Sequence, residues 1–148
     1  MTTLKDLLGA PPKRQAVVND ACQVLDAEVD DKGGLSGLAI KAAYAVIKGI
    51  KPGFIPEVVD SLLDDFLGAF EPHYARAQAA GVSPGAELKR SAGQAAESLL
   101  AITDARAARA NRAVVQKTYD KLRPTAKKHV ESAMPRVADL LDRHVRVG

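Results

Sequence analysis

The sequence predicts an all-α protein, and three observations lead to this prediction. Apolar residues recur at helical spacing almost throughout, and no segment alternates as a strand would. Glycines and prolines stand between these segments, where they begin or end helices. Aromatic residues make up only 4% of the chain and tryptophan is absent, which favours alanine-mediated helix contacts. At 148 residues we expect one domain, residues 1–148, built as a bundle of five to seven helices.

Two helices are expected before the first glycine pair. Thr3 and Asp6 have the spacing of a capping pair, and they predict a short helix that ends at Gly9. A pair of prolines precedes the second helix, whose apolar stripe spans residues 18–29. Residues 30–34 are rich in Asp and Gly, and we expect them to form a loop.

A third helix is expected over residues 35–50, and it is unusually apolar. On a helical wheel Gly37, Lys41 and Lys48 form only a narrow polar strip. A helix that is apolar nearly all round is typical of a protein core. We therefore expect this helix at the centre of the bundle. The narrow strip also disfavours membrane-surface contact, since helices that lie on membranes usually have a wide charged face.

A proline-glycine turn separates this helix from a fourth. Pro56 is expected at the first helical position, and Pro72 is expected to kink or break the helix before Gly81. An antiparallel return would bring Lys48 and Lys51 toward Asp60 and Asp64 of the fourth helix.

Start and stop signals also divide the second half. Ser83, followed by a proline, predicts the start of a fifth helix. Either Thr103 or Asp104 caps a sixth helix, or the two lie at a bend in a long one. Pro124 is expected to end that segment, and Thr125 to cap the last helix.

The charge is unevenly distributed along the chain. Residues 1–75 contain 7 Lys/Arg and 11 Asp/Glu, a net charge of −4, whereas residues 76–148 contain 14 and 7, a net charge of +7. The basic half could face an acidic partner, or the two halves could attract each other.

A basic face is expected on a helix that spans residues 105–123 and its continuation. The candidate residues for binding an anion or a nucleic acid are Arg106, Arg109, Arg112, Lys117, Lys121, Lys127 and Lys128. No aromatic residue is interleaved on this face for base stacking, and no helix-turn-helix glycine turn precedes it. These absences disfavour nucleic acid, and they favour a solvated face or one paired with the acidic half.

The sequence offers no constellation that predicts catalysis or metal binding. The histidines, His73, His129 and His144, are not at metal-ligand spacing, and no paired cysteines occur. Cys22 lies on the apolar stripe of its helix, where a buried, inert thiol is expected. We therefore expect a protein that is not an enzyme and that has no cofactor and no metal.

No targeting or membrane-spanning segment is predicted. The longest apolar run covers residues 42–47 only, whereas a transmembrane helix needs about 20 residues. The amino-terminal residues lack the pattern of a signal peptide. We therefore expect a cytoplasmic protein.

Three functions remain open at this point. The leading hypothesis is a non-enzymatic interaction or scaffold protein of unknown partner, which could self-associate. The first alternative is binding of nucleic acid or an anionic surface through the basic face of residues 106–128. The second is a carrier of lipid or another small apolar ligand, with a pocket beside Leu38, Tyr44 and Ile47.

The chain also resembles a family of short, all-helical bacterial proteins of about this length and of unknown function. The residues that carry the resemblance are Gly34-Leu35-Ser36-Gly37, Ala39-Ile40-Lys41-Ala42, Lys51-Pro52-Gly53, Thr103-Asp104-Ala105-Arg106, Ala126-Lys127-Lys128 and Met134-Pro135-Arg136. These motifs are helix starts, helix stops and packing residues. The resemblance implies the fold class and a bacterial, cytoplasmic setting, but no activity or site.

Overall fold

The computed structural model describes residues 2–147, with side chains for residues 2–145, and the all-α prediction is confirmed. Within these residues there are seven helices and no strands. The helices are α1 (Leu4–Leu8), α2 (Lys13–Asp31), α3 (Gly34–Lys48), α4 (Phe54–Ala80), α5 (Pro84–Arg90), α6 (Ala92–Ala108) and α7 (Ala113–Val147).

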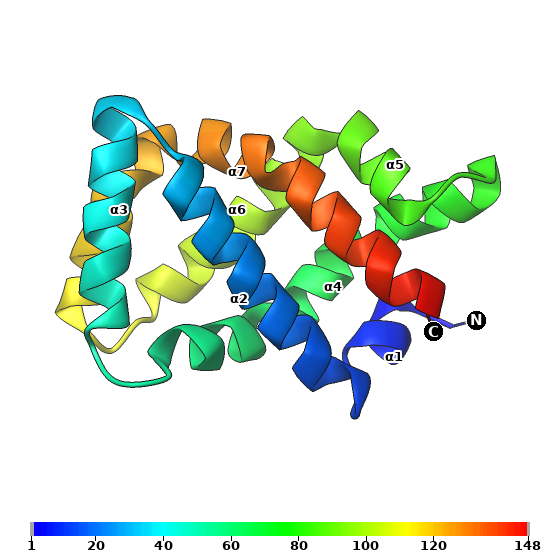
Figure 1. Cartoon of the computed structure of the whole chain (residues 1–148), viewed down its shortest axis with the longest axis horizontal. Helices are drawn as coiled ribbons and strands as arrows, with labels where there is room; N and C mark the ends of the chain where they lie inside the picture. Colours follow the sequence, from blue (N-terminus) through cyan, green and yellow to red (C-terminus); the bar gives the residue numbers. More distant parts are fainter. Residues whose placement is uncertain (1, 148) are drawn as a thin grey trace.

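The long helices α4 and α7 organise the molecule (Figure 1). The other helices pack against one or both of them, and α2 crosses the front of the bundle. One core cluster joins α1, α2, α4, α5, α6 and α7. Its largest fully buried side chains are Leu4, Leu8, Val17, Leu88 and Met134.

The short helix α1 forms as the capping pair predicts. Thr3 Oγ1 accepts a hydrogen bond from the Asp6 amide (3.2 Å), and Asp6 Oδ2 accepts one from the Thr3 amide (3.0 Å). These two bonds satisfy amide groups that an uncapped helix would leave free. Leu4 and Leu8 are then fully buried, so a helix of only five residues is anchored in the core.

The apolar helix α3 is not at the centre of the bundle, and that expectation was wrong. It stands at one end of the molecule, at the left of Figure 1, and contributes no side chain to the core cluster. Only Gly37 is buried, because its Cα lies against the backbone of Lys32, where a Cβ would meet the carbonyl carbon at 2.6 Å. The composition of a helix indicates that it can be buried, but does not determine what covers it. The longer α4 and α7 supply the central surfaces instead.

The helix end expected at Pro124, and the break that was one of two alternatives at Pro72, do not occur. Helix α4 continues through Pro72, and α7 continues through Pro124 and Pro135. All three prolines lie on exposed faces, and so do Gly68, Asp120 and Glu131, the residues four positions before them. The carbonyl that each proline leaves without an amide partner can therefore bond to water, which lowers the cost of an interior proline.

The chain turns instead at Ser91 and at residues 109–112. Thr103 and Asp104 neither cap a helix nor mark a bend; they lie inside α6. Thr103 Oγ1 bonds back to the Leu100 carbonyl (3.2 Å), and Asp104 accepts hydrogen bonds from α7. Their polar groups serve helix–helix contacts, which a local sequence signal does not distinguish from a cap.

Ion pairs join the acidic and basic halves of the chain. Arg136 of α7 binds Glu28 (2.6 Å) and Asp31 of α2, and Arg143 binds Asp20 (2.7 Å). The mutual attraction of the two halves is therefore a property of the fold.

Two lysines at the turn between α3 and α4 have other partners than the sequence predicts. Lys51 pairs with Glu57 (2.9 Å) and Lys48 lies 4.0 Å from Asp26, whereas Asp60 and Asp64 both bind Arg14. The expected contact of Lys48 and Lys51 with the two aspartates was wrong, because α1 and the start of α2 occupy that side of α4.

Candidate functional site

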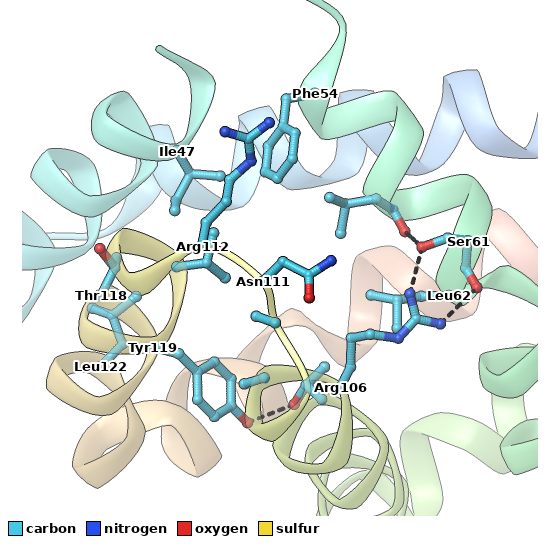
Figure 2. A pocket seen from close by; sticks show the side chains of 15 residues that line it. Ile47, Phe54, Ser61, Leu62, Arg106, Asn111, Arg112, Thr118, Tyr119 and Leu122 are labelled. Carbon is cyan, nitrogen blue, oxygen red and sulfur yellow. Dashed lines mark hydrogen bonds between the residues drawn. The ribbon is translucent and has the colours of Figure 1, made fainter. Parts of the chain in front are cut away.

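A cleft of about 400 Å³ lies between the ends of four helices (Figure 2). It is bounded by the last turn of α3, the first turns of α4, the last turn of α6 and the first turns of α7. Most of its wall is apolar, formed by Ile47, Phe54, Val58, Leu62, Val115 and Leu122. This volume falls within the range of about 300–1,000 Å³ that small-molecule sites occupy.

Local sequence explains why side chains from α4 and α7 face the cleft. Gly53 adopts a left-handed conformation (φ 76°), which glycine accepts without steric cost, and α4 begins directly after it. Phe54, Val58 and Leu62 follow at four-residue intervals and share one face of α4. On α7, Val115 and Leu122 are seven residues apart, which is two helical turns and also places them on one face.

The inner wall of the cleft is held by hydrogen bonds between α6 and α7. Tyr119 Oη donates to Asp104 Oδ1 (2.5 Å) and lies 2.7 Å from Thr103 Oγ1, while Arg123 Nε donates to the same Asp104 oxygen (2.8 Å). Burial, reinforced by Asp104, raises the pKa of Tyr119, and the hydrogen bond from Arg123 lowers the pKa of Asp104. Tyr119 is therefore a neutral phenol whose hydroxyl is already engaged, and it serves as a fixed wall.

Two arginines and an asparagine lie at the edge of this apolar space. Arg106 donates to Ser61 Oγ (2.9 Å) and to the Ser61 carbonyl (3.2 Å), which ties α6 to α4. The guanidinium carbon of Arg112 lies 5.8 Å from the centre of the Phe54 ring, within cation–π range. Figure 2 shows the Asn111 side chain between the two arginines.

The predicted basic face is divided between two helices. The expected continuous helix over residues 105–123 was wrong, because the chain turns at residues 109–112. Arg106 ends up on α6, Arg109 follows its end, and Arg112 precedes α7. Lys127 binds Glu97 (2.9 Å), whereas Lys117, Lys121 and Lys128 are exposed on α7. Of the seven predicted residues, only Arg106 and Arg112 line the cleft.

Only one of the three residues predicted to contact an apolar ligand reaches the cleft. Ile47 lines it, whereas Leu38 is 65% exposed on the outer side of α3. The Tyr44 hydroxyl donates to Asp26 of α2, and burial together with Asp26 raises the pKa of Tyr44. Leu35 and Val46 extend the exposed surface of α3, at 87% and 48% exposure.

The thiol of Cys22 is half-buried on α2. It is thus less buried than the sequence predicts. Burial and the nearby Asp26 raise its pKa, which disfavours the thiolate.

A second polar cluster lies inside the fold, away from the cleft. His73 of α4 is 3% exposed, and its Nδ1 accepts from Arg76 (2.9 Å) and lies 2.8 Å from Ser91 Oγ. Ser91 Oγ donates to the carbonyl of Glu87 (2.8 Å), and the Glu87 carboxylate binds Arg90 (2.6 Å). These contacts join α4 to the turn between α5 and α6.

No group of three or more His, Cys, Asp or Glu side chains in the described residues is arranged to hold a metal ion. Likewise, none of the helices in this part of the chain is long and apolar enough to cross a membrane.

Sequence reasoning missed Phe54 and Asn111 as cleft residues. Phe54 follows the Lys51-Pro52-Gly53 turn, a signal that was present but was interpreted only as a helix stop. Asn111 lies between Ala110 and Arg112 in a stretch with helical spacing, and nothing local predicts its place in the cleft.

The fold and the cleft define an all-α protein with a partly apolar, ligand-sized site between its helices. The chain belongs to a protein family of unknown function, DUF6918, whose family model matches residues 4–145. The resemblance to an uncharacterised helical family is thereby confirmed. No curated protein and no solved structure matches the chain.

Proposed function

We propose that this protein binds a small molecule with an apolar body in the cleft between α3, α4, α6 and α7. The observation that carries the proposal is a space of about 400 Å³ whose wall is apolar on all four helices. Apolar side chains around an open space lose packing contacts that a bound apolar group would restore. An apolar ligand would also remove this wall from water, at roughly 25 cal/mol per Å².

The position of the cleft supports the proposal independently of its size. It lies where the ends of four helices meet, and such places between helices are common locations of ligand sites in helical proteins. The hydrogen bonds of Tyr119 and Arg106 fix two of its sides. A wall that is already fixed loses little conformational freedom when a ligand binds.

The test uses phenylnaphthylamine, a neutral apolar dye whose fluorescence rises when it leaves water. We expect saturable binding to the wild-type protein with one site per chain. The variant Val115→Trp places a large ring in the cleft, where it fills existing space. We expect this variant to fold with the wild-type helical circular dichroism and to lose dye binding by at least about tenfold.

A matched control separates the cleft from the exposed surface of α3. The variant Leu35→Ser with Leu38→Ser removes two exposed apolar side chains that do not line the cleft. Dye binding should persist in it at wild-type affinity. If this control loses binding while Val115→Trp keeps it, the dye binds α3 and the proposal is wrong. If Val115→Trp does not fold, Leu122→Phe gives the same test from another part of the wall.

The exposed side of α3 favours self-association as a second candidate function. Leu35, Leu38 and Val46 share this surface with small alanines, and small residues allow a second copy of the helix to approach closely. Light scattering coupled to size exclusion should show a dimer that Leu35→Ser with Leu38→Ser dissociates. A monomer at high concentration would contradict self-association and leave the ligand proposal unaffected.

A further inference from the structure

We infer that the ligand of the cleft is a small amphipathic anion, with its acidic group at the positively charged edge that Arg112 and Arg106 give the cleft and its apolar body against the helix walls. This inference rests on the proposed function and adds the chemical class of the ligand. It depends on the charge and position of three side chains at the cleft, Arg106, Asn111 and Arg112.

The first observation concerns the partners of the arginines. Elsewhere among the described side chains, five arginines bind a carboxylate, namely Arg14, Arg90, Arg123, Arg136 and Arg143, and two, Arg76 and Arg109, do not. Arg106 and Arg112 also have no carboxylate within salt-bridge distance among the described side chains, and they are the two arginines that line the cleft. Their positive charges at the cleft are therefore not neutralised by the protein.

The second observation is that no acidic residue lines the cleft. Asp104, which lies behind the wall residue Tyr119, is engaged by Arg123 and Tyr119. An anion entering the cleft therefore meets two positive charges and no free carboxylate. A cation would meet the same two positive charges with no carboxylate to compensate for their repulsion.

The third observation is that the arginines are positioned without losing their capacity to donate. Arg106 is directed by its bonds to Ser61 and Arg112 by the ring of Phe54. A guanidinium carries five N–H donors, and a cation–π contact uses none of them. Figure 2 shows Asn111 between the two arginines, so its amide could add a further donor. Planar guanidinium groups suit carboxylate, sulfonate and phosphate oxygens especially well.

These observations also limit the size and nature of the ligand. The cleft holds a ring system or a short acyl chain, and its wall offers few polar groups beyond the arginines and Asn111. A ligand with one anionic group and an otherwise apolar body fits both the positively charged edge and the apolar wall of the cleft. A free small molecule is favoured over a lipid that stays in its bilayer, because the space lies between the ends of four helices and not on an outward-facing helix surface.

The test compares two probes that share an aromatic body. Anilinonaphthalene sulfonate carries an anionic group that the neutral phenylnaphthylamine lacks. We expect the wild-type protein to bind the sulfonate about tenfold more tightly than the neutral dye at low salt. The preference should shrink as salt is added, because screening weakens the contribution of exposed charges.

Two arginine variants separate the anion site from general positive charge. Arg112→Gln should weaken sulfonate binding about fivefold and leave the affinity for the neutral dye within about twofold. The matched control is Arg109→Gln, because Arg109 has no carboxylate partner either but does not line the cleft. This control should change the affinity for neither probe.

The outcomes distinguish the two proposals. If neither probe binds, the proposed function itself is wrong. If both probes bind equally, or if Arg112→Gln weakens both alike, only the anionic class is wrong. Competition then identifies the source of the anion: decanoate should displace the sulfonate more strongly than decanol does. Sedimentation with phosphatidylglycerol vesicles that depends on Arg112, without displacement by decanoate, would overturn the assignment to a free small molecule.

Discussion

The two ends of this molecule use apolar residues in opposite ways. At one end, Leu4, Leu88 and Met134 are fully buried where α1, α4, α5 and α7 meet. At the other end, α3 exposes Leu35 and Leu38, and the apolar walls beside it enclose a cleft. The first, which we call the packed end, holds the fold together. The second, the loosely packed end, leaves apolar surface and space uncovered. This difference supports the proposal that the binding site lies at the second end, because apolar surface that the fold leaves uncovered is typical of interaction and ligand sites.

The largest expected effect compares one truncation at each end. Leu88→Ala removes a fully buried side chain and should lower the free energy of unfolding by about 3 kcal/mol. Leu122→Ala makes the same chemical change in the wall of the cleft, where the side chain is half-buried. It should cost about 1 kcal/mol, because less contact is lost there. Urea unfolding followed by circular dichroism measures both values, and equal losses would contradict the comparison.

A second pair of variants tests how closely the helices of the packed end approach. A Cβ on Gly85 would lie 2.6 Å from the carbonyl oxygen of Ala138, so α5 and α7 would have to separate. Gly85→Ala should lower the free energy of unfolding by about 1–3 kcal/mol. Gly68→Ala is the control, since its nearest neighbour would be Lys5 Cε at 3.8 Å. It should raise stability by up to about 1 kcal/mol, because alanine is the better helix former.

The smallest effect is a pH dependence that originates in the packed end. Burial, with the nearby charge of Arg76, lowers the pKa of His73; Arg90 acts in the same direction and Glu87 against it. The unfolded chain therefore binds this proton more readily than the folded chain does. Stability is full above about pH 6.5, the ordinary value for histidine, and falls as the pH drops through the lowered folded pKa.

The variant His73→Gln measures that contribution. Between pH 7 and pH 5 the wild type should lose more stability than His73→Gln in urea unfolding. His129 also has a lowered pKa, through burial and then Lys32, but it is present in both proteins and cancels in the difference. Identical pH slopes would show that the His73 cluster does not carry the effect.

Much of the fold could be predicted from local patterns. The fold class follows from helical periodicity, and the capping pair of Thr3 and Asp6 was correctly interpreted because it acts within four residues. The positions of Thr103 and Asp104 were misinterpreted, because their partners Tyr119 and Arg123 belong to another helix. Local sequence does not contain that information.

The candidate site was predictable only in fragments. Arg106 and Arg112 were predicted as anion contacts, and Ile47 as a contact for an apolar ligand, but they belonged to separate hypotheses. The turn at residues 109–112 joins them, because it brings the start of α7 beside the ends of α3 and α6. The expectation that α3 lies at the centre was wrong for a related reason, because the apolar composition of a helix does not determine which elements cover it.

Methyl NMR of the wild-type protein with phenylnaphthylamine tests most directly that the binding site lies at the loosely packed end. Binding should shift the methyl resonances of Ile47, Val115 and Leu122, which line the cleft. The methyls of Leu4 and Leu88 in the packed core should stay unchanged. Shifts at Leu35 and Leu38 alone, or no saturable shifts at the cleft, would contradict the account.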